Sequence, residues 1–189
     1  MDPMRSRSRS PLPARGERER KRPGNKSRKP ELEIDVIVRS PLWRKRRNAG
    51  TVVKKAIRAA AWAASTSRAE LAIVLGDDSG IRALNRQWRG KDAPTNVLSF
   101  PSAAPGKGRA VSPYIGDIVI AYQTTAREAV AEHKRFDHHL AHLAVHGFLH
   151  LIGYDHENDR DAETMERLER RILRRLAVPD PYAARDADI

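Results

Sequence analysis

The chain has 189 residues, a net charge of +12 and no cysteine. It is long enough for one domain with a sizeable core, and the lack of thiols excludes disulfides and restricts metal ligands to histidine and carboxylate. No apolar run approaches the roughly 18 residues that a membrane span needs, and the charged N-terminus lacks the apolar region of a secretory signal. We therefore expect a cytoplasmic protein without membrane contacts.

Residues 1–30 are rich in Arg, Ser and Pro and nearly free of apolar side chains. They hold eleven Lys/Arg against three acidic residues, a net of +8 that leaves +4 for the rest of the chain. Such a segment buries too little apolar surface to offset the entropy of ordering, so we predict a disordered basic tail. Two roles stay open for this tail: it raises solubility, or it is an arm that binds nucleic acid.

The folded domain is predicted to span residues 31–183, with a C-terminal tail at 184–189. The apolar periodicity predicts, in chain order, a strand at 33–38, a helix at 51–64, a strand at 70–75, a helix capped by Asp77 or Asp78 that runs to Trp88, strands at 96–100 and 116–121, and helices at 123–134, 137–152 and 160–176. Four strands among five helices, not in strict alternation, indicate an α+β fold with a small mixed sheet.

All seven histidines fall between positions 133 and 156. In "HGFLHLIGYDH", residues 146–156, His146 and His150 are four positions apart and therefore project from one face of a helix. Gly153 is suited to end that helix in a left-handed conformation, which lets His156 return as a third ligand. Three neutral nitrogens leave a tetrahedral zinc with one open position, as catalytic zinc sites do. The spacing matches the metzincin pattern and predicts one Zn²⁺ on a zincin-like helix.

The remaining histidines are not expected to bind the metal. His142 continues the stripe of four-residue steps and is a candidate to contact a ligand histidine. We expect His133, His138 and His139 on the surface, because successive steps of four residues drift around a helix.

Gly147 stands where zinc proteases with this spacing carry the glutamate that acts as general base. Glycine inside a helix costs about 1 kcal/mol relative to alanine, so the position needs a reason. Two reasons are open: close packing of the helix, or clearance beside the metal for a tetrahedral phosphate. With either reason peptide hydrolysis loses its usual base, whereas zinc still lowers the pKa of a bound water to about 7.

A phosphodiester substrate also needs a cation to stabilise its charged oxygens, and arginine suits this role because it is bidentate and permanently charged. The stretch "LNRQWRGKDAPTNVLSFP", residues 84–101, offers Arg86, Arg89 and Lys91 just before a strand. The helix dipole also explains basic residues at a helix end. This stretch therefore indicates phosphate binding only in combination with the histidine motif.

The motif "HGFLHLIGYDH" resembles the signature of the YbeY family of bacterial endoribonucleases. The resemblance also includes "LNRQWRGKDAPTNVLSFP", "GDIVIA" at 116–121, "MERLE" at 165–169 and "DPY" at 180–182, and it covers about residues 32–182. It implies that His146, His150 and His156 bind zinc at the edge of a sheet and that Arg89 is the family's invariant arginine at the active site. Asn96 stands where many members carry aspartate, and we interpret that position as structural.

The resemblance implies a single-strand-specific, zinc-dependent endoribonuclease that acts in 16S rRNA 3′ end maturation and ribosome quality control. The expected partners are rRNA, the small ribosomal subunit and a ribosomal or assembly-factor protein. Either a zinc-activated water or the RNA 2′-hydroxyl would attack the phosphate while Arg89 holds it. Two alternatives stay open: a ribosome assembly or binding factor with a structural zinc, and a metzincin-like metalloprotease.

Overall fold

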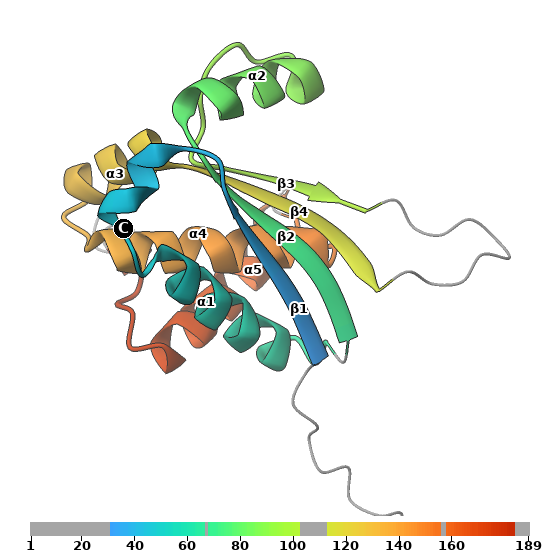
Figure 1. The fold of residues 1–189 in the computed structure, drawn as a ribbon. Coiled ribbons are helices and arrows are strands. Elements are labelled where there is room, and N and C mark those ends of the chain that lie inside the picture. Colours follow the sequence, from blue (N-terminus) through green and yellow to red (C-terminus); the bar gives the residue numbers. More distant parts are fainter. Residues whose placement is uncertain (1–30, 67, 103–112, 156–157, 184–189) are drawn as a thin grey trace, which may run out of the picture.

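The computed structural model describes residues 31–66, 68–102, 113–155 and 158–183 (Figure 1). The predicted tails at 1–30 and 184–189 lie outside these ranges, and so does His156, the third predicted zinc ligand. The division of the chain into a domain and two tails therefore stays a prediction.

A four-stranded mixed sheet with the strand order β1-β2-β4-β3 forms the centre of the described structure. Strands β1, β2 and β4 run parallel, whereas β3 pairs antiparallel with β4 and forms one edge. Helices cover both faces of β4, which therefore buries four apolar residues in succession. The strands are β1 (Glu31–Val38), β2 (Arg68–Gly76), β3 (Val97–Pro101) and β4 (Tyr114–Ala121).

Five α-helices lie within the described ranges, which confirms the predicted α+β class. Helices α1, α4 and α5 enclose the main core on one face of the sheet, and α2 packs on the opposite face over a smaller apolar cluster (Figure 1). A short 3-10 helix, η1 (Pro41–Lys45), precedes α1 and was not predicted. The α-helices are α1 (Ala49–Ala63), α2 (Asp78–Arg89), α3 (Tyr122–Ala131), α4 (Phe136–Leu151) and α5 (Asp159–Arg175).

Helix α4 is the central helix, because it contacts α1, α3, α5 and the strands β3 and β4. These neighbours bury most of its circumference, so its apolar residues are not confined to one stripe. The helix ends at Leu151, and Gly153 adopts a left-handed φ of +91° just beyond it, as predicted. The fold thus places the C-terminal half of α4 beneath the β3 edge of the sheet.

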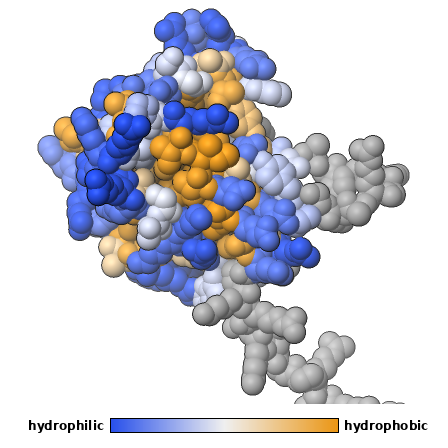
Figure 2. All heavy atoms as spheres, viewed as in Figure 1, coloured by the Kyte–Doolittle hydropathy of each residue, from blue (hydrophilic) through white to orange (hydrophobic). Residues whose placement is uncertain are grey.

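The surface is mainly hydrophilic, but Figure 2 shows one apolar area on the side of the sheet that carries α2. Ile37 and Val38 at the end of β1 are among the exposed large apolar residues. Within the described ranges, every helix is too short or too polar to cross a bilayer.

Candidate functional site

His146 and His150 lie side by side near the C-terminal end of α4. Their Nε2 atoms are 3.1 Å apart, and the ring centroids are separated by 4.6 Å with the planes nearly perpendicular. The four-residue spacing on one helix face produces this approach, as the sequence predicted. The third predicted ligand, His156, lies outside the described residues, so its position relative to this pair is not described.

Glu169 of α5 lies behind the histidine pair and has no exposed surface. Its Oε1 atom is 2.9 Å from Nδ1 of His146, and its Oε2 atom is 3.2 Å from Nε2 of His142. The hydroxyl of Tyr182 donates a short hydrogen bond to the same Oε2 atom. Burial alone would raise the pKa of Glu169, but the hydrogen bonds from His142 and His146 outweigh burial and lower the pKa to about 2.

The donor atoms of this cluster suit a divalent metal. Two imidazole nitrogens whose lone pairs face each other at 3.1 Å repel unless a proton or a cation lies between them. Imidazole nitrogen is a preferred ligand of Zn²⁺, and the carboxylate behind one ring is the usual support of a metal-binding histidine. Within the described ranges, no group of three or more His, Cys, Asp or Glu residues completes a metal site. A third ligand would have to come from elsewhere, and His156 is the predicted one.

A second carboxylate and histidine pair lies on the same side of α4. His139 is buried, contrary to the expected surface position, and its Nε2 atom is 2.8 Å from Oε2 of Glu128. Asn96 donates to the same carboxylate oxygen at 2.9 Å and accepts a hydrogen bond from the backbone N–H of Val97. Burial would raise the pKa of Glu128, but the hydrogen bonds from His139 and Asn96 lower it overall. These contacts support a structural role for Asn96, since an aspartate there would bring two carboxylates together.

Gly147 faces the sheet rather than the histidine pair. A Cβ atom at Gly147 would lie 2.8 Å from Cγ2 of Ile118 and 3.1 Å from the hydroxyl of Ser99. The Ser99 hydroxyl donates to the carbonyl oxygen of Gly147 at 3.1 Å, which ties α4 to β3. Close packing therefore explains the glycine, and the hypothesis of clearance for a phosphate is wrong. The same packing leaves no room at this position for the glutamate of a zinc protease.

Arg89 is the last residue of α2, a helix that packs on the face of the sheet opposite α4. Its side chain is exposed. The neighbouring Trp88 is 66 % exposed and rests edge-on against Phe100 of β3, with ring centroids 6.0 Å apart. The predicted catalytic arginine thus ends a helix on one face of the sheet, whereas His146 and His150 belong to a helix on the other face.

A groove of about 1040 Å³ opens beside the histidine pair. One lysine, Lys134, and several carboxylates line this groove together with His139, His142 and His146; the carboxylates belong to Glu128, Glu132, Glu166, Glu169 and Asp180. The excess of acidic side chains makes the groove a poor place for the phosphate backbone of a nucleic acid.

The fold and the cluster together define an α+β protein whose central helix presents a histidine pair, backed by a buried carboxylate, beneath the edge of its sheet. The family model described as "Endoribonuclease YbeY" matches residues 42–177. The chain belongs to the YbeY endoribonuclease family.

Individual relatives agree with this assignment. Proteins called "Endoribonuclease YbeY" are 58% identical in Rhodopseudomonas palustris strain HaA2 and 54% identical in Bradyrhizobium diazoefficiens. Each match covers 80% of this chain, and 82% and 85% of the respective relatives. The solution structure of TM1509 from Thermotoga maritima has a similar fold, with a TM-score of 0.50 and 21% identity over 82% of this chain and 93% of that one.

The spacing of the motifs gave no role to Glu169 or Tyr182, which lie in the segments "MERLE" and "DPY". One signal was available for Glu169. Met165, Leu168, Ile172 and Leu173 form the apolar stripe of α5, and Glu169 interrupts that stripe with a charge. A carboxylate on the buried face of a helix needs partners, and the structure supplies them from α4 and from the C-terminal segment.

Proposed function

We propose that this chain is a zinc-dependent endoribonuclease that cuts single-stranded rRNA in 16S 3′ end maturation and in ribosome quality control. The observation that carries the proposal is the approach of the His146 and His150 Nε2 atoms to 3.1 Å beside the buried Glu169, in a chain of the YbeY endoribonuclease family. Such a substrate implies a cytoplasmic enzyme whose partners are the small ribosomal subunit and a ribosomal or assembly-factor protein.

His146, His150 and His156 would hold the zinc. When bound, zinc would supply a Lewis acid that polarises the phosphate and makes water a better nucleophile at neutral pH. The RNA 2′-hydroxyl is the alternative nucleophile.

Glu169 would keep His146 ready to bind. To bind zinc through Nε2, His146 would carry its ring proton on Nδ1, where the carboxylate of Glu169 accepts the hydrogen bond and Nε2 faces His150. Its pKa of about 2 keeps Glu169 ionised at neutral pH, so the hydrogen bond persists. His142 and Tyr182 donate to the other carboxylate oxygen and restrict its rotation.

Arg89 would bind the phosphate. Its guanidinium forms no ion pair within the described residues, whereas Arg82 on the same helix is paired with Asp92 at 2.8 Å. Trp88 beside it offers an exposed ring on which a base can stack. Ser99, next to Phe100, bonds to Gly147 of α4, so an RNA strand that crosses β3 would meet Trp88 and Arg89 first and the histidine pair next.

The two alternatives differ from this proposal in testable ways. A metalloprotease would need a general base, and the packing around Gly147 leaves no space for it at the usual position. A ribosome assembly factor with a structural zinc would still bind ribosomes, but it would unfold rather than merely lose activity when the metal ligands are replaced.

The experiment that tests the proposal is incubation of the purified chain with a 16S rRNA precursor, with and without a chelator. Cleavage that the chelator abolishes while the protein stays folded supports a zinc nuclease. Unfolding on chelation, or cleavage that continues unchanged, would reject it.

A further inference from the structure

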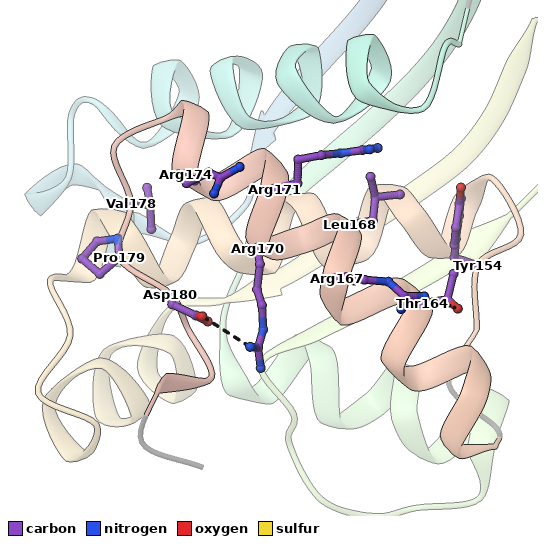
Figure 3. Close-up of a pocket in the computed structure, with 10 residues that line it drawn as sticks. All are labelled: Tyr154, Thr164, Arg167, Leu168, Arg170, Arg171, Arg174, Val178, Pro179 and Asp180. Carbon is purple, nitrogen blue, oxygen red and sulfur yellow. Dashed lines mark hydrogen bonds and ion pairs between the residues drawn. The ribbon is translucent and has the colours of Figure 1, made fainter. Parts of the chain in front are cut away.

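A second groove, of about 760 Å³, follows α5, and arginine is the commonest residue in its lining. Figure 3 shows the arginines one after another along the helix, with Tyr154 at one end of the groove and Asp180 at the other. The four arginines are Arg167, Arg170, Arg171 and Arg174. Because Asp180 also lines the acidic groove beside the histidine pair, the two grooves adjoin each other.

The arginines of this groove differ in their partners. Arg170 lies 3.5 Å from Asp180 and 3.9 Å from Glu166, and Arg167 lies 3.4 Å from Glu163. Arg171 and Arg174 are exposed, and neither forms an ion pair with a carboxylate in the part of the chain that the structure describes. Arg167 and Arg170 are thus compensated by neighbouring carboxylates, and Arg171 and Arg174 give the groove its net positive charge.

We propose that this arginine groove binds the phosphate backbone of single-stranded RNA on one side of the cleaved bond. The inference rests on the proposed function, since it assigns a course to the RNA that the histidine cluster would cut. Tyr154 lines the arginine groove and follows His150 by four positions, on the turn after α4. The groove therefore begins close to the histidine pair. From Arg167 to Arg174 the helix rises by on the order of 10 Å, which is enough for more than one phosphate group.

The charge of the lining side chains favours the arginine groove over the acidic groove as the place for RNA. The groove beside His146 is lined by Glu128, Glu166 and Glu169 among other carboxylates, which repel a phosphate backbone. Guanidinium groups bind phosphate oxygens in bidentate pairs and are less strongly hydrated than ammonium groups. An RNA strand that leaves the histidine pair therefore gains attraction along α5 and meets repulsion in the acidic groove.

The test replaces Arg171 and Arg174 by glutamine in the full chain and measures the binding of a labelled single-stranded RNA over a range of salt concentrations. The dependence of log affinity on log salt should become shallower by roughly 0.7 per lost phosphate contact. The affinity at physiological salt should fall about tenfold. Arg171→Lys with Arg174→Lys should keep most of the salt dependence, because the charges remain. Both side chains are exposed, so the variants should melt at the wild-type temperature.

The matched control removes two exposed charges elsewhere, with Arg44→Gln and Arg47→Gln. This control should bind RNA like the wild type. Wild-type affinity and salt dependence in the Arg171/Arg174 variant would overturn the proposal and leave a different anion, such as an acidic protein segment, as the occupant. An equal loss in the control would also overturn it, because overall charge would then explain the binding. The binding assay needs no cleavage, so a failure of the nuclease assignment would appear separately, as uncut RNA with the wild-type protein.

Discussion

The Nδ1 atom of His146 lies 2.9 Å from Oε1 of Glu169, a carboxylate with no exposed surface. The contact joins α4 to α5 and explains why an ionisable side chain interrupts the apolar stripe of α5. It also sets the direction of the other ring nitrogen, which faces His150. The arrangement ties the proposed metal ligand to the core of the fold.

Glu169→Gln should weaken zinc binding by about 10- to 100-fold, the usual effect of removing such a support. The glutamine amide has one acceptor oxygen for the donors of His146, His142 and Tyr182, so at least one donor loses its partner. Competition with a chromogenic chelator measures the zinc affinity. Glu128→Gln is the matched control, because Glu128 also contacts a histidine of α4 but does not contact His146. Equal zinc affinity in the two variants would show that Glu169 does not position the ligand.

Arg89→Ala should reduce single-turnover cleavage of RNA by on the order of 10²–10³, because it removes one donor that stabilises charge at the phosphate. Zinc content and melting temperature should stay near wild type, since the side chain is exposed and is not a proposed ligand. Arg89→Lys should restore activity only in part. Arg82→Ala on the same helix should have little effect, because that arginine is already paired with Asp92. Normal cleavage by Arg89→Ala would show that Arg89 takes no part in the reaction and only ends the helix.

Gly147→Ala should lower the free energy of unfolding. The added Cβ would lie 2.8 Å from Ile118, and overpacking of this kind costs about 1–3 kcal/mol, against about 1 kcal/mol gained from helix propensity. Gly80→Ala in α2 is the control, since its Cβ would meet nothing closer than 3.6 Å, and it should be neutral or stabilising. Denaturant unfolding measures both variants. A Gly147→Ala protein as stable as the wild type would contradict the packing explanation.

The contribution of Glu128 to stability should depend on pH. Its folded-state pKa lies below the ordinary value of 4.5, so the folded protein binds fewer protons here than the unfolded chain does at acidic pH. The stabilisation is complete above the ordinary pKa and is lost as the pH falls through 4.5 towards the lowered pKa. The wild type should therefore be more stable than Glu128→Gln at neutral pH, and the difference should narrow as the pH falls below 4.5. Urea titrations at several pH values measure it, and a constant difference would show that folding does not lower this pKa.

The periodicity of the sequence was sufficient to predict the four strands, the five α-helices and the approach of His146 and His150. Each of these features follows from residues that lie close together in the sequence. It could not place Arg89, since the side of the sheet on which α2 packs is decided by long-range contacts. It was also wrong for His139, which was expected on the surface. The histidine stripe alone does not show that α4 is covered on nearly all sides, and burial of His139 depends on Glu128 from another helix.

The two hypotheses for Gly147 illustrate the same limit. Its helical position was predictable, but whether the missing side chain faces a metal or the sheet depends on how α4 is rotated against β4. The short distances to Ile118 and Ser99 show that this position faces the sheet.

The central claim is that RNA cleavage depends on one metal ion held by the histidine cluster, and zinc titration of chelator-stripped protein tests it most directly. Cleavage of a single-stranded RNA should return in proportion to added zinc, reach its maximum at about one ion per chain as a single three-histidine site requires, and stay absent in His150→Ala at every zinc concentration. Cleavage by the stripped protein, or full recovery in the His150→Ala variant, would contradict the account.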